Sequence, residues 1–216
     1  MGLAIGILNG IIVTKMKLAP FIVTLAMSYI ARGFTYIVTG AKPVYMESEV
    51  FNEIGNGFLG PIPLPIIYMI IVFLILFFIL NRTKFGRHVY AIGGNEEAAR
   101  FSGINIDKIR VITYAMVGVL SSMVGVIMCS KLYSGQPTIG MNAELDAIAA
   151  VILGGTSFMG GIGTLGGTLI GALVIGVINN GLNLLGVNSF WQSVAKGLII
   201  ILAVYIDVLK NRKKRK

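Results

Sequence analysis

The chain has 216 residues, of which 56% are hydrophobic and only 12% charged, and its mean hydropathy is +0.85. This composition excludes an ordinary soluble domain and is typical of a membrane protein. The net charge of +9 fits basic cytoplasmic loops better than nucleic-acid binding, because the Lys and Arg residues gather on alternate loops. Cys129 is the single cysteine, which excludes an internal disulfide and a cysteine-based metal site.

The first apolar segment, residues 2–13, rises only about 18 Å as a helix. This is less than the ~30 Å of a bilayer core, so we expect that Met1 is not the natural start of the protein. Five later windows are long and apolar enough to span a membrane: 18–38, 61–80, 111–129, 165–181 and 190–208. Segment 145–158 is shorter, and a full span and a re-entrant dip both stay open for it. The sequence predicts an all-α polytopic bundle of about six to seven transmembrane segments.

Basic residues predict the topology of these segments. Lys15 and Lys17, the loop 81–110 and the tail from Lys210 are basic and are expected inside. Loops 39–60 and 130–143 carry little positive charge and are expected outside. The C-terminus is therefore predicted to be cytoplasmic, in a protein that crosses the membrane several times.

The loop 81–110 is a polar island in an apolar chain. Within it, Asn95 is a good N-cap and Gly103 a good stop signal, which predicts a short exposed helix between them. Acidic residues in the first turn and Arg100 further along suit the helix dipole. We expect this helix to dock into a partner's groove. The predicted docking residues are Asn95, Glu96, Glu97, Ala98, Ala99, Arg100 and Gly103.

Glycines recur every four residues at 163, 167 and 171. A second series with the same spacing contains Gly176 and consists of Thr164, Thr168, Ala172, Gly176 and Asn180. Small residues at this spacing allow helix backbones to approach closely in lipid. The GGIG turn that begins at Gly160 needs backbone angles that glycine adopts without strain. Close helix packing is favoured over a phosphate-binding loop, because the G-x-x-x-x-G-K-S/T pattern is absent and no strand is expected before the glycines.

Two basic residues fall inside predicted spans. Arg32 and Lys196 are both expected to snorkel toward the headgroups, since neither has an obvious carboxylate partner within a span. Amides gather around the 181–189 turn, where they suit either an uncharged polyol or helix capping, with capping favoured. Asn179 and Asn180 are the candidates for a substrate pathway.

Long ungapped motifs carry a family resemblance. The stretches PFIVTLAMSYIARGFTYIVTG, GRHVYAIGGNEEAARFSGI and ELDAIAAVILGGTSFMGGIGTLGGTLIGALVIGVINNGLNLLG resemble the permease of bacterial sugar-importing ABC transporters, the ribose permease group in particular. Family members are longer at the N-terminus, so residues 1–216 are expected to be a single permease domain that forms the C-terminal two-thirds of a longer chain.

The resemblance implies the rest of the machine. The permease would pair with another copy or a close relative in the bacterial inner membrane, with a soluble sugar-binding protein outside and ATPases in the cytoplasm. ATP and Mg²⁺ would bind to the ATPase, so no cofactor is expected on this chain and no nucleic acid is an expected partner. Glu97, Ala98, Ala99 and Gly103 match the E-A-A-x-x-x-G core through which permeases couple to ATPases. Residues 81–110 would form this coupling loop.

We therefore predict a transport subunit, with no catalytic residue and no metal site, for a monosaccharide such as ribose. The precise sugar and the choice between homodimer and heterodimer stay open. Two other classes are considered. A secondary transporter would need intramembrane carboxylates or half-helices, and an intramembrane enzyme would need a nucleophile and a base in the bilayer. The only histidine, His88, lies in the 81–110 loop.

Overall fold

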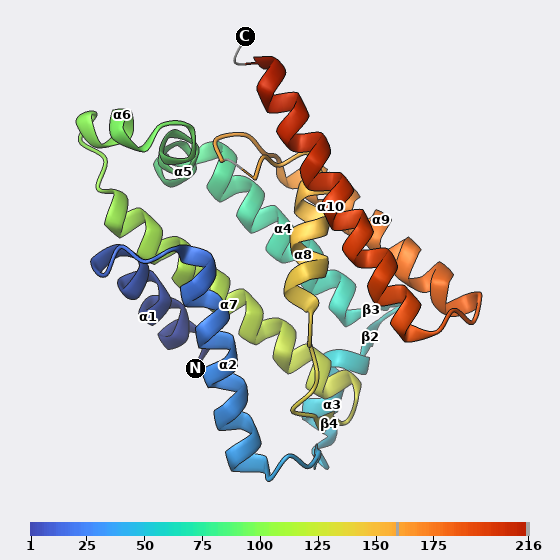
Figure 1. The fold of residues 1–216 in the computed structure, drawn as a ribbon. Coiled ribbons are helices and arrows are strands. Elements are labelled where there is room, and N and C mark those ends of the chain that lie inside the picture. The colour runs from blue at the N-terminus through green and yellow to red at the C-terminus, as the bar shows by residue number, and fades with distance from the viewer. Residues whose placement is uncertain (159, 215–216) are drawn as a thin grey trace. The chain divides into compact units, whose positions relative to one another are not determined.

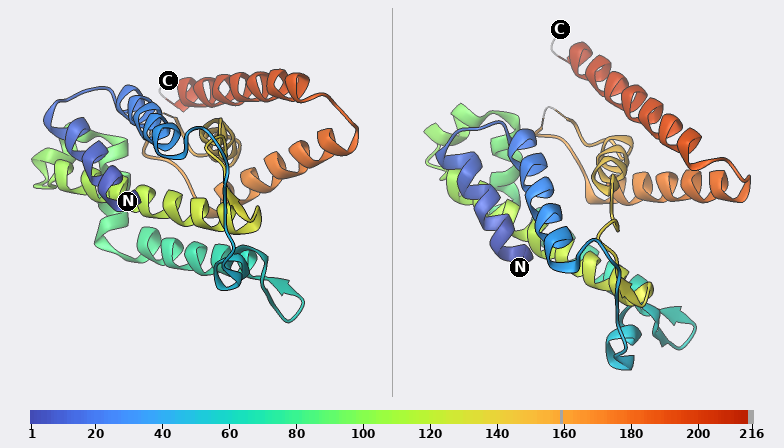
Figure 2. Two further views of the ribbon diagram at one scale, coloured as in Figure 1. Left: turned by 90° about the horizontal axis from the view of Figure 1, so that it is seen from below. Right: turned by 60° about the horizontal axis from the view of Figure 1, so that its bottom comes forward.

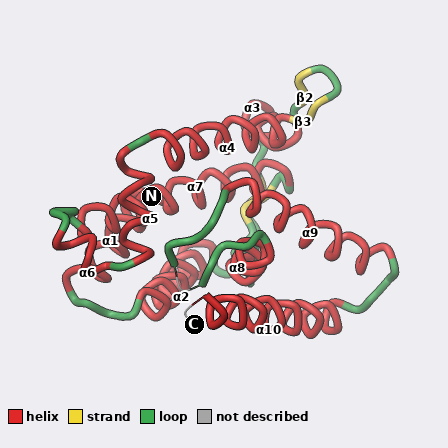
Figure 3. Tube along the Cα trace, turned by 90° about the horizontal axis from the view of Figure 1, so that it is seen from above, coloured by secondary structure: helices red, strands yellow, loops and turns green. Residues whose placement is uncertain are grey.

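A computed structural model describes residues 1–158 and 160–214, within which the chain folds into helices joined by short strands and turns (Figure 1). The helices are α1 (Gly2–Lys15), α2 (Pro20–Thr39), α3 (Glu49–Asn56), α4 (Leu64–Arg82), α5 (Lys84–Gly94), α6 (Glu96–Phe101), α7 (Ile106–Lys131), α8 (Ala143–Leu153), α9 (Leu165–Leu184) and α10 (Ser189–Lys214). The strands are β1 (Val44–Tyr45), β2 (Phe58–Leu59), β3 (Ile62–Pro63) and β4 (Ser134–Gly135). Figure 3 shows how little of the trace is strand. The all-α prediction is confirmed.

In the part that the structure describes, four helices are long and apolar enough to cross a membrane: α2, α4, α7 and α9. Each coincides with a predicted span. The backbone of the fifth window, 190–208, is helical as part of α10. The total of six to seven segments stays a prediction.

The length of helix α8 bears on whether segment 145–158 can span a membrane. It has 11 residues and ends at Leu153, so it rises only about 16 Å. A helix of this length cannot cross a hydrocarbon core of ~30 Å. The helix alone is therefore too short for a full span, and a re-entrant placement of segment 145–158 stays a prediction.

The described chain divides into two compact units. Unit 1 comprises Met1–Ile75 and Arg100–Ile139, and unit 2 comprises Leu76–Ala99 and Gly140–Lys216. The chain passes from one unit to the other within α4, within α6 and again between Ile139 and Gly140. Whether the whole chain acts as a single permease domain stays a prediction.

Unit 1 is built on the pairing of α1 with α7, which lie side by side in Figures 1 and 2. Glycines make this pairing close. A side-chain carbon at Gly10 would lie 2.7 Å from the Cα of Val111, and one at Gly118 would lie 3.0 Å from the Cα of Gly6. The sequence analysis overlooked this glycine series, although Gly2, Gly6 and Gly10 have the same spacing of four as the glycines that it singled out.

The two loops of unit 1 that are predicted to lie outside contact each other. Strand β1 pairs antiparallel with β4, with Val44 opposite Gly135. Helix α3, which the sequence analysis treated as loop, packs against the end of α7. Ser130, which is 0% exposed, donates to the carbonyl of Phe51 at 2.7 Å and accepts from the amide of Gly55 at 2.6 Å. These contacts put loops 39–60 and 130–143 at the same end of unit 1, in agreement with the alternation of basic loops.

Unit 2 is built on α8, which packs against both α9 and α10. Helix α9 presents Gly171 to α8, where a side-chain carbon would lie 2.8 Å from the amide of Gly154. Gly167 faces the carbonyl of Gly154. Thr164 begins α9 by accepting from the amide of Gly167 at 3.1 Å. The buried core here is small, consisting of Ala149, Ala150 and Ile175.

Candidate functional site

The 81–110 loop contains two helices, although the sequence predicted one. Thr83 turns the chain out of α4, because its hydroxyl donates to the carbonyl of Ile79 at 2.6 Å and accepts from the amide of Gly86 at 3.4 Å. Gly86 packs against the carbonyl of Leu80 so closely that a side chain would not fit. The additional helix, α5, was signalled by Thr83 as a potential N-cap ahead of it, a signal that the sequence analysis passed over.

The predicted docking helix is present as α6. The side-chain oxygen of Asn95 accepts from the amide of Ala98 at 3.0 Å, so Asn95 is the expected N-cap. Gly103 has φ +80° and lies two residues after the last helical residue, as a stop signal requires. Glu96 and Glu97 occupy the first turn and Arg100 the last turn. The helix is six residues long, slightly shorter than the predicted span.

The exposure of α6 divides its residues into two sets. Glu97, Ala98 and Arg100 are exposed, and Glu96 is half-buried. Ala99 is only 4% exposed, so it does not lie on the face that a partner can reach. Phe101, which the sequence analysis did not select, is 92% exposed. A lone phenylalanine in a polar loop was the available signal, since a large aromatic side chain left in solvent is a candidate anchor for a partner.

Helix α5 lies directly against the glycine turn that joins α8 to α9. The hydroxyl of Tyr90 donates to the carbonyl of Gly163 at 2.9 Å. One turn of helix further on, a side-chain carbon at Gly93 would lie 2.5 Å from the amide nitrogen of Gly161. Gly160 and Gly161 have φ of +90° and +76°, so the glycine requirement predicted for this turn is confirmed. The contact itself joins two segments that the sequence analysis had treated separately.

A cavity of about 330 Å³ lies beside this contact, within unit 2. Its walls come from the end of α4, from α5, from the glycine turn and from the start of α9, and include Tyr90, Gly93, Thr156 and Thr168. The glycine turn is therefore packed on one side against α5 and open on another.

The predicted packing glycines occupy different environments. Gly167 and Gly171 lie against α8, as described above. Gly163 precedes α9, and a side-chain carbon there would lie 2.8 Å from the side chain of Thr156. Gly176 faces open space within the described residues. The geometry thus separates two helix-contact glycines from one turn glycine and one outward-facing glycine, and their role in assembly stays a prediction.

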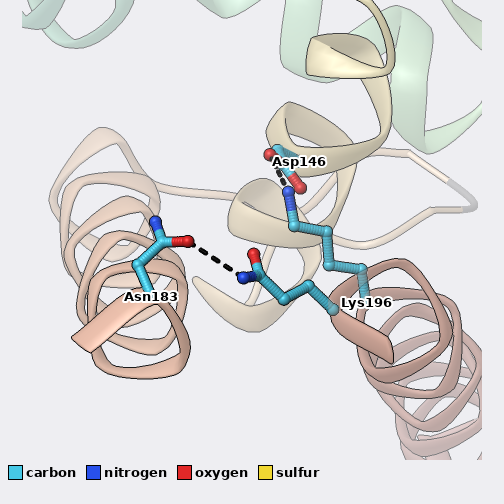
Figure 4. Close-up of polar contacts among 4 residues, drawn as sticks. Asp146, Asn183 and Lys196 are labelled. Atoms are coloured by element: carbon cyan, nitrogen blue, oxygen red, sulfur yellow. Dashed lines mark hydrogen bonds and ion pairs between the residues drawn. The ribbon is translucent and has the colours of Figure 1, made fainter. Parts of the chain in front are cut away.

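The expectation that Lys196 lacks a carboxylate partner is wrong, and its snorkelling toward the headgroups stays a prediction. Its Nζ lies 2.9 Å from Oδ2 of Asp146 on α8, and both side chains are about one-third exposed, at 33% and 31% (Figure 4). Asp146 lies in the short helix α8, outside the five long predicted spans, so its partnership with Lys196 could not be predicted from the span pattern. Snorkelling of the half-buried Arg32 stays a prediction.

The amides near the 181–189 turn mostly hold the turn together. Gln192 donates to the side chain of Asn183 at 2.9 Å (Figure 4). It also donates to the carbonyl of Val187 at 2.8 Å, so it helps to close the turn, in agreement with the favoured capping role. Asn180 is exposed. The side-chain oxygen of Asn179 is buried and has no hydrogen-bond partner among the described residues. The substrate-pathway role of these two residues stays a prediction.

Unit 1 contains a larger cavity, of about 820 Å³, between α1, α2 and α7. Its polar lining is uncharged and consists of hydroxyl and amide side chains: Asn9, Thr24, Thr35, Thr113, Tyr114, Ser121 and Ser122. The side-chain oxygen of Asn9 is buried and lacks a hydrogen-bond partner in the described part of the chain. The sequence analysis missed this cavity, because these residues are scattered over three helices and share no spacing.

Comparison with known proteins identifies the family. Residues 1–204 match the family described as branched-chain amino acid transport system / permease component. The chain belongs to this family of membrane permeases. No solved structure matches it.

Curated relatives narrow the comparison to sugar importers. The chain is 50% identical to the ribose import permease protein RbsC of Bacillus subtilis, over 94% of this chain and 64% of that protein. It is 48% identical to RbsC of Escherichia coli, over 99% of this chain and 67% of that protein. It is 39% identical to the L-arabinose transport system permease protein AraH of Escherichia coli, over 96% and 63%. The chain therefore spans about two-thirds of the length of these relatives.

These findings place the chain among the membrane permeases. The four long apolar helices among its described residues fit a multi-pass protein of the inner membrane. The comparisons support the predicted resemblance and favour a transport subunit over an enzyme. Among the described residues, no group of three or more His, Cys, Asp and Glu side chains is placed to hold a metal ion.

Proposed function

We propose that the chain is part of the permease subunit of an ATP-driven importer of ribose or a related monosaccharide. The observation that carries this proposal is the 50% identity to a ribose import permease protein across 94% of the chain. An ATP-binding cassette ATPase, which binds ATP and Mg²⁺, a soluble sugar-binding protein and a second permease chain would complete the transporter. The proposal leaves open whether that second chain is identical.

The exposed face of α6 supports coupling to the ATPase. Phe101 offers an apolar anchor, Ala98 lets the partner's surface approach closely, and Glu97 and Arg100 offer charges to its rim. ATP-driven movement of this helix would shift the permease between outward-open and inward-open states. Such coupling requires a difference in contact energy between the states, typically ~1–3 kcal/mol for each linked site.

An uncharged substrate fits the polar groups inside the two units. A monosaccharide presents hydroxyl groups, which both donate and accept hydrogen bonds, as do the amides and hydroxyls that line the unit 1 cavity. The unpartnered oxygens of Asn9 and Asn179 are acceptors for such hydroxyls. We propose that Asn179 and Asn180 border the sugar pathway of the assembled transporter.

Replacing the exposed anchor tests the coupling role. Phe101→Ala in the full-length permease should insert normally but lose co-purifying ATPase, or keep the ATPase and lose sugar-dependent ATP hydrolysis. Phe58→Ala is the matched control, because Phe58 is also exposed, at 67%, in a loop predicted to lie outside. Normal transport and normal ATPase retention in the Phe101 variant would reject the coupling role of α6.

Cysteine labelling tests the topology, including the cytoplasmic C-terminus. In a Cys129→Ser background, single cysteines at Ser102 and Glu49, both exposed, are treated with an impermeant thiol reagent on intact cells. Position 49 should react and position 102 should react only after the membrane is opened. The reverse pattern would invert the proposed orientation.

A further inference from the structure

We propose that Tyr90 and Gly93 of α5 form a joint that passes the movement of α6 to the glycine turn between α8 and α9. This inference rests on the proposed function, because it assumes that α6 is moved by an ATPase. It assigns positioning residues outside the docking helix itself. The joint is defined as Tyr90 and Gly93 on one side and Gly161 and Gly163 on the other.

The first step is the connection between α6 and α5, which leaves no flexible linker. Asn95 alone separates the two helices. Its backbone amide donates to the carbonyl of Ala91 at 3.1 Å and so closes α5. Its side-chain oxygen caps α6 through Ala98. One residue thus belongs to the hydrogen bonding of both helices, and a displacement of α6 must be followed by the end of α5.

The second step is the contact between α5 and the glycine turn. At Gly93 the two backbones meet without an intervening side chain. A side-chain carbon at this position would lie only 2.5 Å from the amide nitrogen of Gly161. The hydrogen bond from Tyr90 to Gly163 fixes the second end of the contact. Two attachment points one helical turn apart restrain rotation as well as translation, whereas a single one would act as a pivot.

The third step leads from the turn into the unit 2 helices. The turn is closed by the hydrogen bond from the amide of Ser157 to the carbonyl of Ile162, at 2.9 Å. Gly163 is followed directly by Thr164, the N-cap of α9. Helix α9 in turn packs against α8 through Gly167 and Gly171. The joint therefore reaches both helices that follow from the glycine turn, and closely packed elements transmit a shift instead of absorbing it.

Adjacent glycines provide a matched test. Gly93→Ala adds a methyl group where the turn leaves no room, while Gly94→Ala adds the same group one residue later, where nothing lies within 4 Å. Both variants gain the same helix propensity. Tyr90→Phe removes only the hydroxyl. Each variant is made in the full-length permease and reconstituted with its ATPase and sugar-binding protein.

The measured quantities are ATPase retention, basal ATP hydrolysis and the ratio of sugar transported to ATP hydrolysed. Tyr90→Phe should retain the ATPase and basal hydrolysis and lower the ratio about threefold to tenfold, as expected for the loss of one hydrogen bond from the transmitting state. Gly93→Ala should lower the ratio further, and Gly94→Ala should match the unmodified protein. A merely structural contact would reduce the amount of assembled transporter and leave the ratio unchanged.

An unchanged ratio in Tyr90→Phe overturns the joint, and so does an equal ratio in Gly93→Ala and Gly94→Ala when both assemble. If Gly93→Ala fails to assemble, Tyr90→Phe decides alone. These outcomes are distinct from failure of the proposed function, which would appear as normal coupling in the Phe101→Ala variant.

Discussion

The two units both rely on glycine for close helix packing, but they differ in what surrounds that packing. In unit 1, α1 and α7 meet through glycines on both helices, and the buried hydroxyl of Ser130 holds α3 against the end of α7. In unit 2, a short helix packs on α9 through Gly154, Gly167 and Gly171 and is held to α10 by a partly exposed ion pair. Partly exposed polar contacts cost less to break than buried ones. The comparison indicates that similar glycine contacts are supported by a buried hydroxyl in unit 1 and by a partly exposed ion pair in unit 2.

The largest expected effects come from filling the glycine contacts. Gly118→Leu should destabilise unit 1 by about 3 kcal/mol or more, the upper end of measured over-packing costs, because a side chain there meets the backbone of α1. Gly171→Leu should act on unit 2 in the same way. Thermal unfolding of the purified protein measures both.

Each of these substitutions has a control on its own helix. Gly125 on α7 and Gly176 on α9 have nothing within 4 Å among the described residues, so leucine at either should leave the melting temperature nearly unchanged. A control that destabilises as much as its partner would show that the glycines act through something other than helix contact.

The next effect tests the buried hydroxyl of Ser130 in unit 1. Ser130→Ala removes an acceptor for the amide of Gly55 and a donor to the carbonyl of Phe51. Leaving buried groups unpaired should cost about 2–3 kcal/mol. Ser122→Ala is the control, because its exposed hydroxyl bonds only to its own helix. Hydrogen exchange at the Gly55 amide should rise in the first variant only.

The ion pair of unit 2 should give a smaller effect. Lys196→Met leaves Asp146 without its partner at 2.9 Å, and partial exposure limits the cost to about 1–2 kcal/mol. The exchange variant, Asp146→Lys with Lys196→Asp, should recover most of the loss. A double-mutant cycle without coupling between the two positions would show that the pair does not hold α8 to α10.

The smallest effect is expected at the α9–α10 turn. Gln192→Ala removes two hydrogen bonds at a partly exposed position, which should cost about 1 kcal/mol. Asn180→Ala, at an exposed position on α9, should cost less. An equal loss of stability in the two variants would mean that the two hydrogen bonds of Gln192 do not stabilise the turn.

Features of both units that depend on neighbouring residues could be predicted from the sequence. Spans, caps and the glycine turn are encoded locally, so Asn95, Gly103 and the four long apolar helices followed from residue types and spacing. Helix α5 and the Gly2–Gly10 series carried local signals that were missed.

Contacts between distant segments carried no such signal. The pair Lys196 and Asp146, the bond from Tyr90 to Gly163 and the burial of Ala99 each depend on how helices far apart in the chain come together. An E-A-A motif predicts a docking helix, but it does not predict that the second alanine faces inward and that Phe101 is the side chain exposed to solvent.

The antiparallel pairing of β1 with β4 has a consequence for synthesis of the chain. Val44 leaves the ribosome long before its partner Gly135, and the whole of α4 to α7 is made in between. The loop that contains α3 must therefore wait, with the amide of Gly55 and the carbonyl of Phe51 still lacking their bonds to Ser130, until α7 has been inserted. Closing so long a loop is slow compared with forming the helices that it contains. Completion of unit 1 is thus set by the insertion of α7, and a nascent chain halted before Gly135 should stay sensitive to protease between α2 and α4.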